Sequence, residues 1–161
     1  MDVHKLKNKP NTMIYLASDH AGFELKNAII KFLTQEGIAF KDMGPYEYAE
    51  LDDYPDYIIP AAQEVAKNPQ TDKGIVIGGS GQGEAIAANK VKGVRAALYY
   101  GGSKDIITLS RIHNDANILS LGARFVTEEE AVEVVKLWLK TDFSAEERHK
   151  RRLEKIDKFT Q

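Results

Sequence analysis

The sequence contains no cysteine, which excludes a disulfide framework and any metal site built from thiolates. The formal net charge is only −2, so no basic field points to nucleic acid as a partner. No apolar run approaches the roughly 20 residues of a membrane-spanning helix. Residues 1–12 are polar and carry lysines, without the apolar segment of a signal peptide. We therefore expect a cytoplasmic protein with no nucleic-acid or membrane partner, in which residues 1–12 form a flexible N-terminal extension.

What is present is the composition of an ordinary globular domain, with 161 residues, 43% of them hydrophobic and 29% charged. Short apolar runs alternate with segments whose apolar residues recur at helical spacing. The predicted strands are 13–17, 38–43, 74–77, 94–99 and 117–121, and the predicted helices between them are 23–35, 58–67, 85–90 and 104–111. Two further helices close the chain, each opened by a capping box, Thr127-Glu128-Glu129-Glu130 and Ser144-Ala145-Glu146-Glu147. This order predicts a single α/β domain over residues 13–161, with a five-stranded parallel sheet covered by helices on both faces.

The most informative segment is Gly78-Gly79-Ser80-Gly81-Gln82-Gly83-Glu84, between a predicted strand and a predicted helix. Such a loop exposes backbone N–H groups beside a helix N-terminus, which together bind a phosphate or a developing oxyanion. The segment is not a P-loop, which needs Lys at position 84, and not a dinucleotide-binding fingerprint, which needs Gly there. The segment is also not a nucleophile elbow around Ser80, because that motif needs glycine at the position of Gln82. A carboxylate beside an oxyanion cradle suits proton abstraction next to a carbonyl, so Glu84 is a candidate base. The alternative is a tight turn without a ligand.

Other polar residues lie where ligands bind in parallel sheets. Asp19-His20 directly follows the first predicted strand, and the Tyr100-Gly101-Gly102 turn follows the fourth. His113 lies between a predicted helix and the last strand, and is a candidate acid or base. The alternatives are a loop or capping role for Asp19-His20 and a helix C-terminal position for His113. The four histidines are scattered without an H-E-x-x-H pattern, so we expect no metal.

A basic run, Arg148-His149-Lys150-Arg151-Arg152, lies in the last predicted helix. Most of it is typical of a solvated face, because two of its cations can pair with acids four positions earlier, Glu146 with Lys150 and Glu147 with Arg151. Arg148 and Arg152 share a face and have no acid three or four positions away. Two guanidinium groups so placed predict a bound phosphate dianion.

Taken together, these motifs resemble the type B ribose-5-phosphate isomerases, in the superfamily that includes the galactose-6-phosphate isomerase subunits. The resemblance runs from about Met13 to Phe159. The motifs that carry it are Ala17-Ser18-Asp19-His20-Ala21-Gly22, Asp52-Asp53-Tyr54-Pro55, Gly78 to Lys90, Ser110 to Asn114, Leu121-Gly122-Ala123-Arg124 and Arg148 to Arg152.

The resemblance implies reversible isomerisation between ribose 5-phosphate and ribulose 5-phosphate, without a metal or cofactor. It implies a Rossmann-like three-layer α/β/α sandwich and a homodimer, or a tetramer, whose active sites use both subunits. Glu84 would move a proton between C2 and C1 through an enediolate, while Ser80 and the loop N–H groups hold the oxyanion. Asp19 and His113 would assist opening of the sugar ring. The remaining residues that the resemblance places on substrate are His20, Tyr54, Gly79, Gly81, Gln82, Gly83, Asn114, Arg124, Arg148 and Arg152.

The chain departs from part of the family at Gly78, where many members carry a cysteine base. It resembles instead the subgroup with a glutamate at the end of the loop, and Glu84 then needs a pKa raised by burial. The segment Tyr100-Gly101-Gly102-Ser103 matches the family poorly and is a candidate for shaping the sugar pocket. The alternative substrates are hexose 6-phosphates, of allose or galactose. The alternative classes are a non-catalytic module that binds a phosphorylated ligand and a subunit that is inactive without a second chain.

Overall fold

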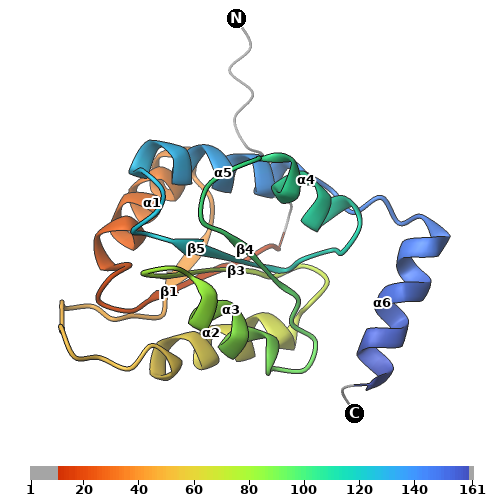
Figure 1. The fold of residues 1–161 in the computed structure, drawn as a ribbon, viewed down its shortest axis with the longest axis horizontal. Coiled ribbons are helices and arrows are strands. Elements are labelled where there is room, and N and C mark those ends of the chain that lie inside the picture. The colour runs from red at the N-terminus through yellow and green to blue at the C-terminus, as the bar shows by residue number, and fades with distance from the viewer. Residues whose placement is uncertain (1–10, 160–161) are drawn as a thin grey trace, which may run out of the picture.

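The computed structural model describes residues 11–159, in which strands and helices alternate along the chain (Figure 1). The strands are β1 (Ile14–Ser18), β2 (Phe40–Asp42), β3 (Lys73–Gly78), β4 (Ala96–Tyr99) and β5 (Ile118–Gly122). The helices are α1 (Phe23–Glu36), α2 (Pro55–Lys67), α3 (Gln82–Asn89), α4 (Asp105–Ile112), α5 (Glu128–Lys140) and α6 (Glu147–Phe159). Every predicted element is present, with its ends displaced by at most a few residues. The predicted flexible extension over residues 1–12 lies almost wholly outside the described residues and stays a prediction. Within the described part of the chain, no helix combines the length and apolarity needed to cross a membrane.

All five strands run parallel, in the order β2-β1-β3-β5-β4. Helices α1, α4 and α5 cover one face of this sheet, and α2 and α3 cover the other (Figure 1). The predicted three-layer α/β/α sandwich with a five-stranded parallel sheet is confirmed. From β1 the chain runs first to β2 on one side and later to β3 on the other side. The carboxyl ends of β1 and β3 therefore flank the topological switch point, where folds of this kind bind ligands.

The central strand β3 shows how the sheet is buried on both faces. Ile75 and Ile77 pack in the core layer that contains Trp138 of α5, whereas Val76 packs in the opposite layer with residues of α2 and α3. All four side chains are fully buried. The alternation follows from the two-residue period of a strand, and burial on both faces explains why the strand is apolar throughout.

The two closing helices begin differently. α5 starts as predicted, because the Thr127 hydroxyl accepts a hydrogen bond from the Glu130 backbone N–H at 3.1 Å. The capping box predicted for α6 is wrong. The Ser144 hydroxyl donates instead to the carbonyl of Ile112 at 2.9 Å, and the helix begins only at Glu147. Ser144 therefore ties the connection before α6 to the end of α4.

Helix α6 stands apart from the three layers, at the end of the molecule where the strands begin (Figure 1). Its buried residues are His149 and Leu153, and the other side chains of the helix are exposed. The helix is thus held to the body by a narrow strip, and it presents a basic surface beyond the amino ends of the strands.

Candidate active site

The glycine loop leaves the carboxyl end of β3 and enters α3 at Gln82. Gly81 has a φ of 76°, and a side chain there would come within 2.8 Å of the backbone of Leu121. The Ser80 hydroxyl accepts a hydrogen bond from the Gln82 N–H at 3.3 Å. The backbone N–H groups of Gly79, Ser80 and Gly81 donate to no acceptor among residues 11–159. These donors are therefore available to an anion, and the anion site predicted for this loop stays a prediction.

Glu84 lies in the first turn of α3 and is only 4% exposed. Its carboxyl group fills the space beside Gly78, where any side chain would collide with it. A cysteine at position 78 is thus incompatible with this placement of Glu84. Burial raises the pKa of the Glu84 carboxyl, a hydrogen bond from its own backbone N–H lowers it, and the nearby Asp19 raises it further. The net direction is upward, as predicted, and brings the group closer to what a general base needs near neutral pH.

Asp19 and His20 follow β1 at the same edge of the sheet. Asp19 is buried, and its Oδ1 accepts a hydrogen bond from the Gly22 N–H at 3.0 Å. His20 is held by Asp52, whose Oδ1 accepts from the His20 backbone N–H at 3.1 Å and lies 2.8 Å from its Nδ1. The switch point thus brings two carboxyl groups, Asp19 and Glu84, next to an oriented histidine.

An arginine and a tyrosine lie directly on the glycine loop. The backbone N–H of Arg124, just after β5, donates to the Gly79 carbonyl at 3.0 Å. The Arg124 guanidinium lies 3.2 Å from where a Cβ on Gly79 would be, and the Tyr54 ring lies 2.8 Å from the same point on Gly83. Because these two loop positions lack side chains, Arg124 and Tyr54 can approach the loop backbone closely.

The remaining four candidates form a second group. His113 caps the C-terminus of α4, Asn114 follows it, and Arg148 and Arg152 lie on α6. The His113 ring stacks on that of His149, with centroids 4.4 Å apart and an interplanar angle of 19°. His149 is buried, and this burial, followed by the charges of His113 and Arg148, lowers its pKa below 6.5. The stack therefore fastens α6 to the end of α4.

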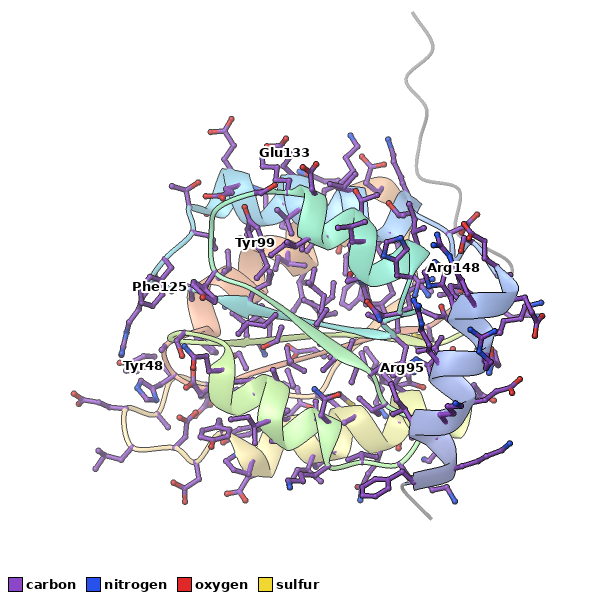
Figure 2. All side chains as sticks on the ribbon, turned by 45° about the vertical axis from the view of Figure 1, so that its right-hand side comes forward. Tyr48, Arg95, Tyr99, Phe125, Glu133 and Arg148 are labelled. Atoms are coloured by element: carbon purple, nitrogen blue, oxygen red, sulfur yellow. The ribbon has the colours of Figure 1, made fainter. Side chains whose placement is uncertain are left out.

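The two groups lie at opposite ends of the sheet. His113 and Asn114 precede β5, whereas the glycine loop follows β3, and these two strands run parallel in register. At about 3.3 Å per residue, the five residues of β5 alone separate the two ends by about 13 Å. In Figure 2, Tyr48 and Arg148 mark opposite sides of the molecule in the same way. One chain therefore does not bring all the candidate residues together.

The charge pairing predicted for α6 is wrong at Arg148. Its Nε lies 2.9 Å from Glu146 Oε2, so the acid expected to pair with Lys150 holds Arg148 instead. Glu146 precedes the first residue of the helix, and the i,i+4 spacing therefore does not apply to it. Both side chains are more than half exposed, and an exposed pair of this kind is weak. Arg148 can thus exchange this carboxylate for another anion at little cost.

Sequence reasoning missed two residues of these groups. The sequence predicts His149 on a solvated face, although Leu153 four positions later is a signal for a buried strip on one side of a helix. Asp52 belongs to a motif quoted above, but its contact with His20 joins positions 32 residues apart. No spacing rule connects such positions before the fold is known.

The fold and this site define a class of protein. A doubly wound parallel sheet presents, at its switch point, N–H donors that have no acceptor among residues 11–159, beside a buried carboxyl group with a raised pKa. Donors of this kind stabilise a developing oxyanion, and such a carboxylate moves a proton. The class is that of acid–base enzymes that act on small anionic substrates.

The chain belongs to the ribose/galactose isomerase family, whose family model matches residues 14–156. The probable ribose-5-phosphate isomerase B of Mycoplasma pneumoniae is 45% identical over 146 residues, which cover 91% of this chain and 93% of that protein. Ribose-5-phosphate isomerase B of Mycolicibacterium paratuberculosis is 44% identical, over 91% of this chain and 90% of that protein. The crystal structure of ribose-5-phosphate isomerase B from Mycoplasma genitalium with bound ribulose-5-phosphate has a TM-score of 0.88 and 42% identity, over 92% of this chain and 96% of that one. The family resemblance drawn from the sequence motifs is confirmed.

Proposed function

We propose that this chain is an aldose–ketose isomerase that interconverts ribose 5-phosphate and ribulose 5-phosphate. The observation that carries the proposal is the buried carboxyl group of Glu84, which follows the N–H groups of the glycine loop that find no acceptor in the described part of the chain. The substrate is supported by the relatives, which are named ribose-5-phosphate isomerase B, and by the ribulose-5-phosphate bound to the Mycoplasma genitalium protein.

The reaction moves one proton between two neighbouring carbons of the open-chain sugar. Glu84 takes the C2 proton, the C–H electrons form a C1–C2 double bond, and the O1 carbonyl oxygen becomes the oxyanion of an enediolate. The Ser80 hydroxyl and the N–H groups of Gly79 and Gly81 stabilise that charge. Protonated Glu84 then returns its proton to C1 while the O2 proton passes to O1, which leaves the ketone at C2. The raised pKa of Glu84 makes it a stronger base for the first step and a usable acid for the second.

Binding and ring opening use the remaining candidates. Ring opening needs a base for the O1 proton and an acid for the ring oxygen, roles that we assign to Asp19 and to His113 of the partner subunit. The phosphate is held by guanidinium and imidazole groups, which suit a dianion. These groups are His20 and Arg124 of one chain with Arg148 and Arg152 of the partner subunit, while Tyr54 and the partner's Asn114 line the sugar.

The proposal requires two copies of the chain. The glycine-loop group and the His113 group lie at opposite ends of one sheet, so a complete site needs one group from each of two chains. A two-fold axis would create two equal sites, because each chain supplies both groups. We therefore propose a homodimer with its active sites at the subunit interface.

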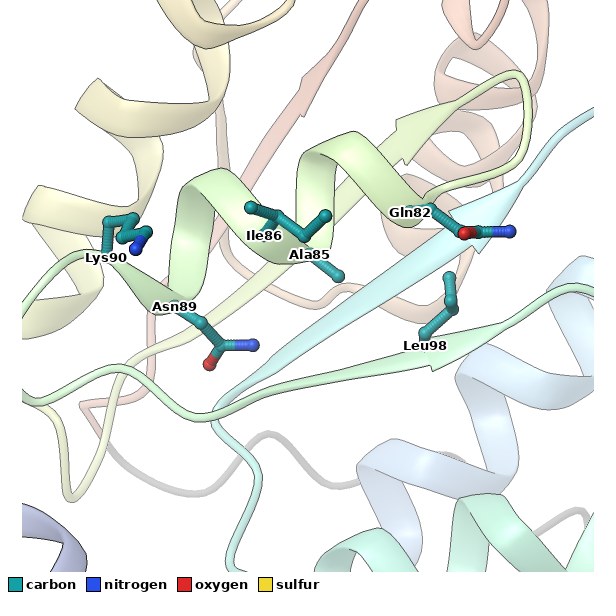
Figure 3. Close-up of a pocket in the computed structure, with 6 residues that line it drawn as sticks. All are labelled: Gln82, Ala85, Ile86, Asn89, Lys90 and Leu98. Carbon is teal, nitrogen blue, oxygen red and sulfur yellow. The ribbon is translucent and has the colours of Figure 1, made fainter.

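A groove of about 410 Å³ beside the glycine loop supports a second copy as the neighbour. It is lined by Gln82, Ala85, Ile86, Asn89 and Lys90 of α3 and by Leu98 of β4 (Figure 3). Ile86 is 63% exposed, and β4 is an edge strand of the sheet. An exposed apolar side chain in a groove beside an edge strand is typical of a surface that another chain covers. The mass of the protein in solution distinguishes a dimer from a tetramer.

A hexose 6-phosphate is the second candidate substrate, because the family model covers ribose and galactose isomerases. The segment Tyr100–Ser103 bears on this choice. Tyr100 follows β4, and its Cβ lies 2.9 Å from where a Cβ on Gly122 would be. Its ring meets that of Phe125 edge-on at 6.0 Å, and both rings are exposed near the carboxyl edge of the sheet. Comparison of kcat/KM for ribose 5-phosphate with the values for allose and galactose 6-phosphates decides the substrate.

The test of the function is formation of ribulose 5-phosphate from ribose 5-phosphate by the purified protein, in buffer that contains EDTA. We expect turnover, and we expect the Glu84→Gln variant to fold and to lose most of it. A folded protein that turns over none of the three sugar phosphates would overturn the proposal. If a second chain then restored turnover, the protein would be a partner-dependent subunit. If no second chain restored it, the protein would be a module that binds a phosphorylated ligand without catalysis. A cytoplasmic location remains a prediction from the sequence, to be tested by cell fractionation.

A further inference from the structure

Asp52 contacts His20 in a way that the proposed reaction does not use. One carboxylate oxygen, Oδ1, accepts the His20 backbone N–H at 3.1 Å and lies 2.8 Å from the His20 Nδ1. The Asp52 side chain is only 4% exposed, whereas that of His20 is 27% exposed. Its second oxygen, Oδ2, is buried and has no hydrogen-bond partner within the described chain. Within the described chain, the Asp52 carboxylate therefore hydrogen-bonds only to His20, which is a residue of the candidate site.

The loop that carries Asp52 is anchored independently of the site. Between β2 and α2, the carbonyl of Pro45 accepts a hydrogen bond from the fully buried Lys26 at 2.6 Å, and Lys26 also pairs with Asp42. Further along the loop, Tyr48 meets the His20 ring edge-on, with centroids 6.4 Å apart. The imidazole is thus held by a carboxylate and an aromatic ring from one segment, which fixes its orientation as well as its position.

The contact also selects one form of the imidazole. An ionised carboxylate can only accept hydrogen bonds, so the Nδ1 of His20 must carry a proton to bond with Asp52. The other ring nitrogen, Nε2, has no hydrogen bond to any described residue, and it is the atom left for a ligand. To donate to a phosphate oxygen, Nε2 must carry a proton as well. The ring that binds the phosphate is then doubly protonated, with Nδ1–H directed at the Asp52 carboxylate 2.8 Å away.

We infer that Asp52 is a positioning residue, which holds His20 with its proton on Nδ1 and presents Nε2–H to the substrate phosphate. The inference rests on the proposed function, in which His20 binds that phosphate. It predicts that Asp52 contributes to binding of the substrate and not to the proton transfer at Glu84, which takes place at the other end of the sugar.

The kinetic test uses Asp52→Asn, which keeps the shape of the side chain and removes its charge. We expect a rise of roughly tenfold in KM for ribose 5-phosphate and in Ki for inorganic phosphate, as for loss of one charged hydrogen bond, with kcat within about threefold of the wild type. The matched control is Asp53→Asn, an exposed neighbour, which should leave all three constants unchanged. In a His20→Ala background, Asp52→Asn should have no further effect, because it acts through the imidazole. Full additivity of the two changes would overturn the inference.

A second readout is independent of activity. Nitrogen NMR of the His20 ring at high pH should show the proton on Nδ1 in the wild type and a shift of the proton to Nε2 in Asp52→Ala. An unchanged tautomer in that variant would also overturn the inference. Because this measurement needs no substrate, failure of the inference can be told apart from failure of the proposed function, which would appear as absence of turnover in the wild type.

Discussion

Glu84→Gln should remove most of the isomerase activity and at the same time stabilise the protein at neutral pH. The pKa of this carboxyl is raised in the folded state above the ordinary value of 4.5, chiefly by burial. Folding therefore favours the protonated form, and the stability that this form provides is complete below about pH 4.5. It is lost as pH rises through the folded pKa, so at neutral pH the ionised carboxylate lowers the stability of the fold. The glutamine side chain has nearly the same shape as that of Glu84 without the charge, so the substitution should remove that cost.

The gain in stability can be predicted from the folded pKa of Glu84 and checked by an independent measurement of the free energy of unfolding. Each unit by which the folded pKa exceeds 4.5 corresponds to about 1.4 kcal/mol. Solvent screens this energy little, since the Glu84 side chain is only 4% exposed. The acid limb of kcat/KM in the wild type gives the folded pKa, and urea denaturation of both proteins at pH 7.5 gives the gain in free energy of unfolding. For a chain of this size, each 1 kcal/mol gained should raise Tm by about 2–4 °C.

The matched control is Glu128→Gln, because Glu128 also lies in the first turn of a helix but is exposed. This variant should keep full activity and gain no stability. At pH 4, the advantage of the Glu84→Gln variant should shrink, because the wild-type carboxyl is then protonated. If Glu84→Gln is no more stable than the wild type at pH 7.5, or if it retains turnover, the reasoning about Glu84 is refuted.

Three further predictions concern the scaffold, each measured by denaturation. Gly22→Ala should destabilise by about 3 kcal/mol, because its Cβ would lie 2.5 Å from the Ile77 carbonyl oxygen; unchanged stability would contradict this close approach. Lys26→Ala should also cost about 3 kcal/mol, since it leaves the carboxylate of Asp42 without its fully buried partner at 2.6 Å; a loss below about 1 kcal/mol would show the pair to be dispensable. Burial lowers the pKa of His149 below 6.5, so its stability contribution is complete above pH 6.5 and is lost as pH falls through the folded pKa. His149→Phe should therefore show a smaller fall in Tm between pH 7.5 and pH 5 than the wild type, and an equal fall would contradict this.

The parts of the site that depend on local sequence could be predicted. The glycine loop, its free N–H groups and the buried position of Glu84 all follow from a strand, a tight turn and the first turn of a helix within about ten residues. The contact between His20 and Asp52 could not be predicted, because 32 residues and a loop without periodic structure separate them. The pairing at Arg148 failed because the prediction started α6 too early.

The division of the site between two ends of the sheet was implicit in the sequence. Asp19 follows a predicted strand, whereas His113 precedes one, and in a parallel sheet these positions lie at opposite edges. The position of α6 could not be predicted from the sequence, because it depends on the stacking of His113 on His149 and on the contact of Ser144 with α4. These contacts place Arg148 at the far end of the molecule from the glycine loop (Figure 2).

The central claim is that one active site takes Glu84 from one chain and His113 from another. The most direct measurement is complementation between Glu84→Gln and His113→Ala, each inactive alone, co-expressed with different tags and purified together. Random pairing makes half of the dimers mixed, and each mixed dimer has one intact site, so about a quarter of the wild-type specific activity should return. Absence of any recovery in mixed dimers of confirmed composition would contradict a shared site, because both residues would then act within the same chain.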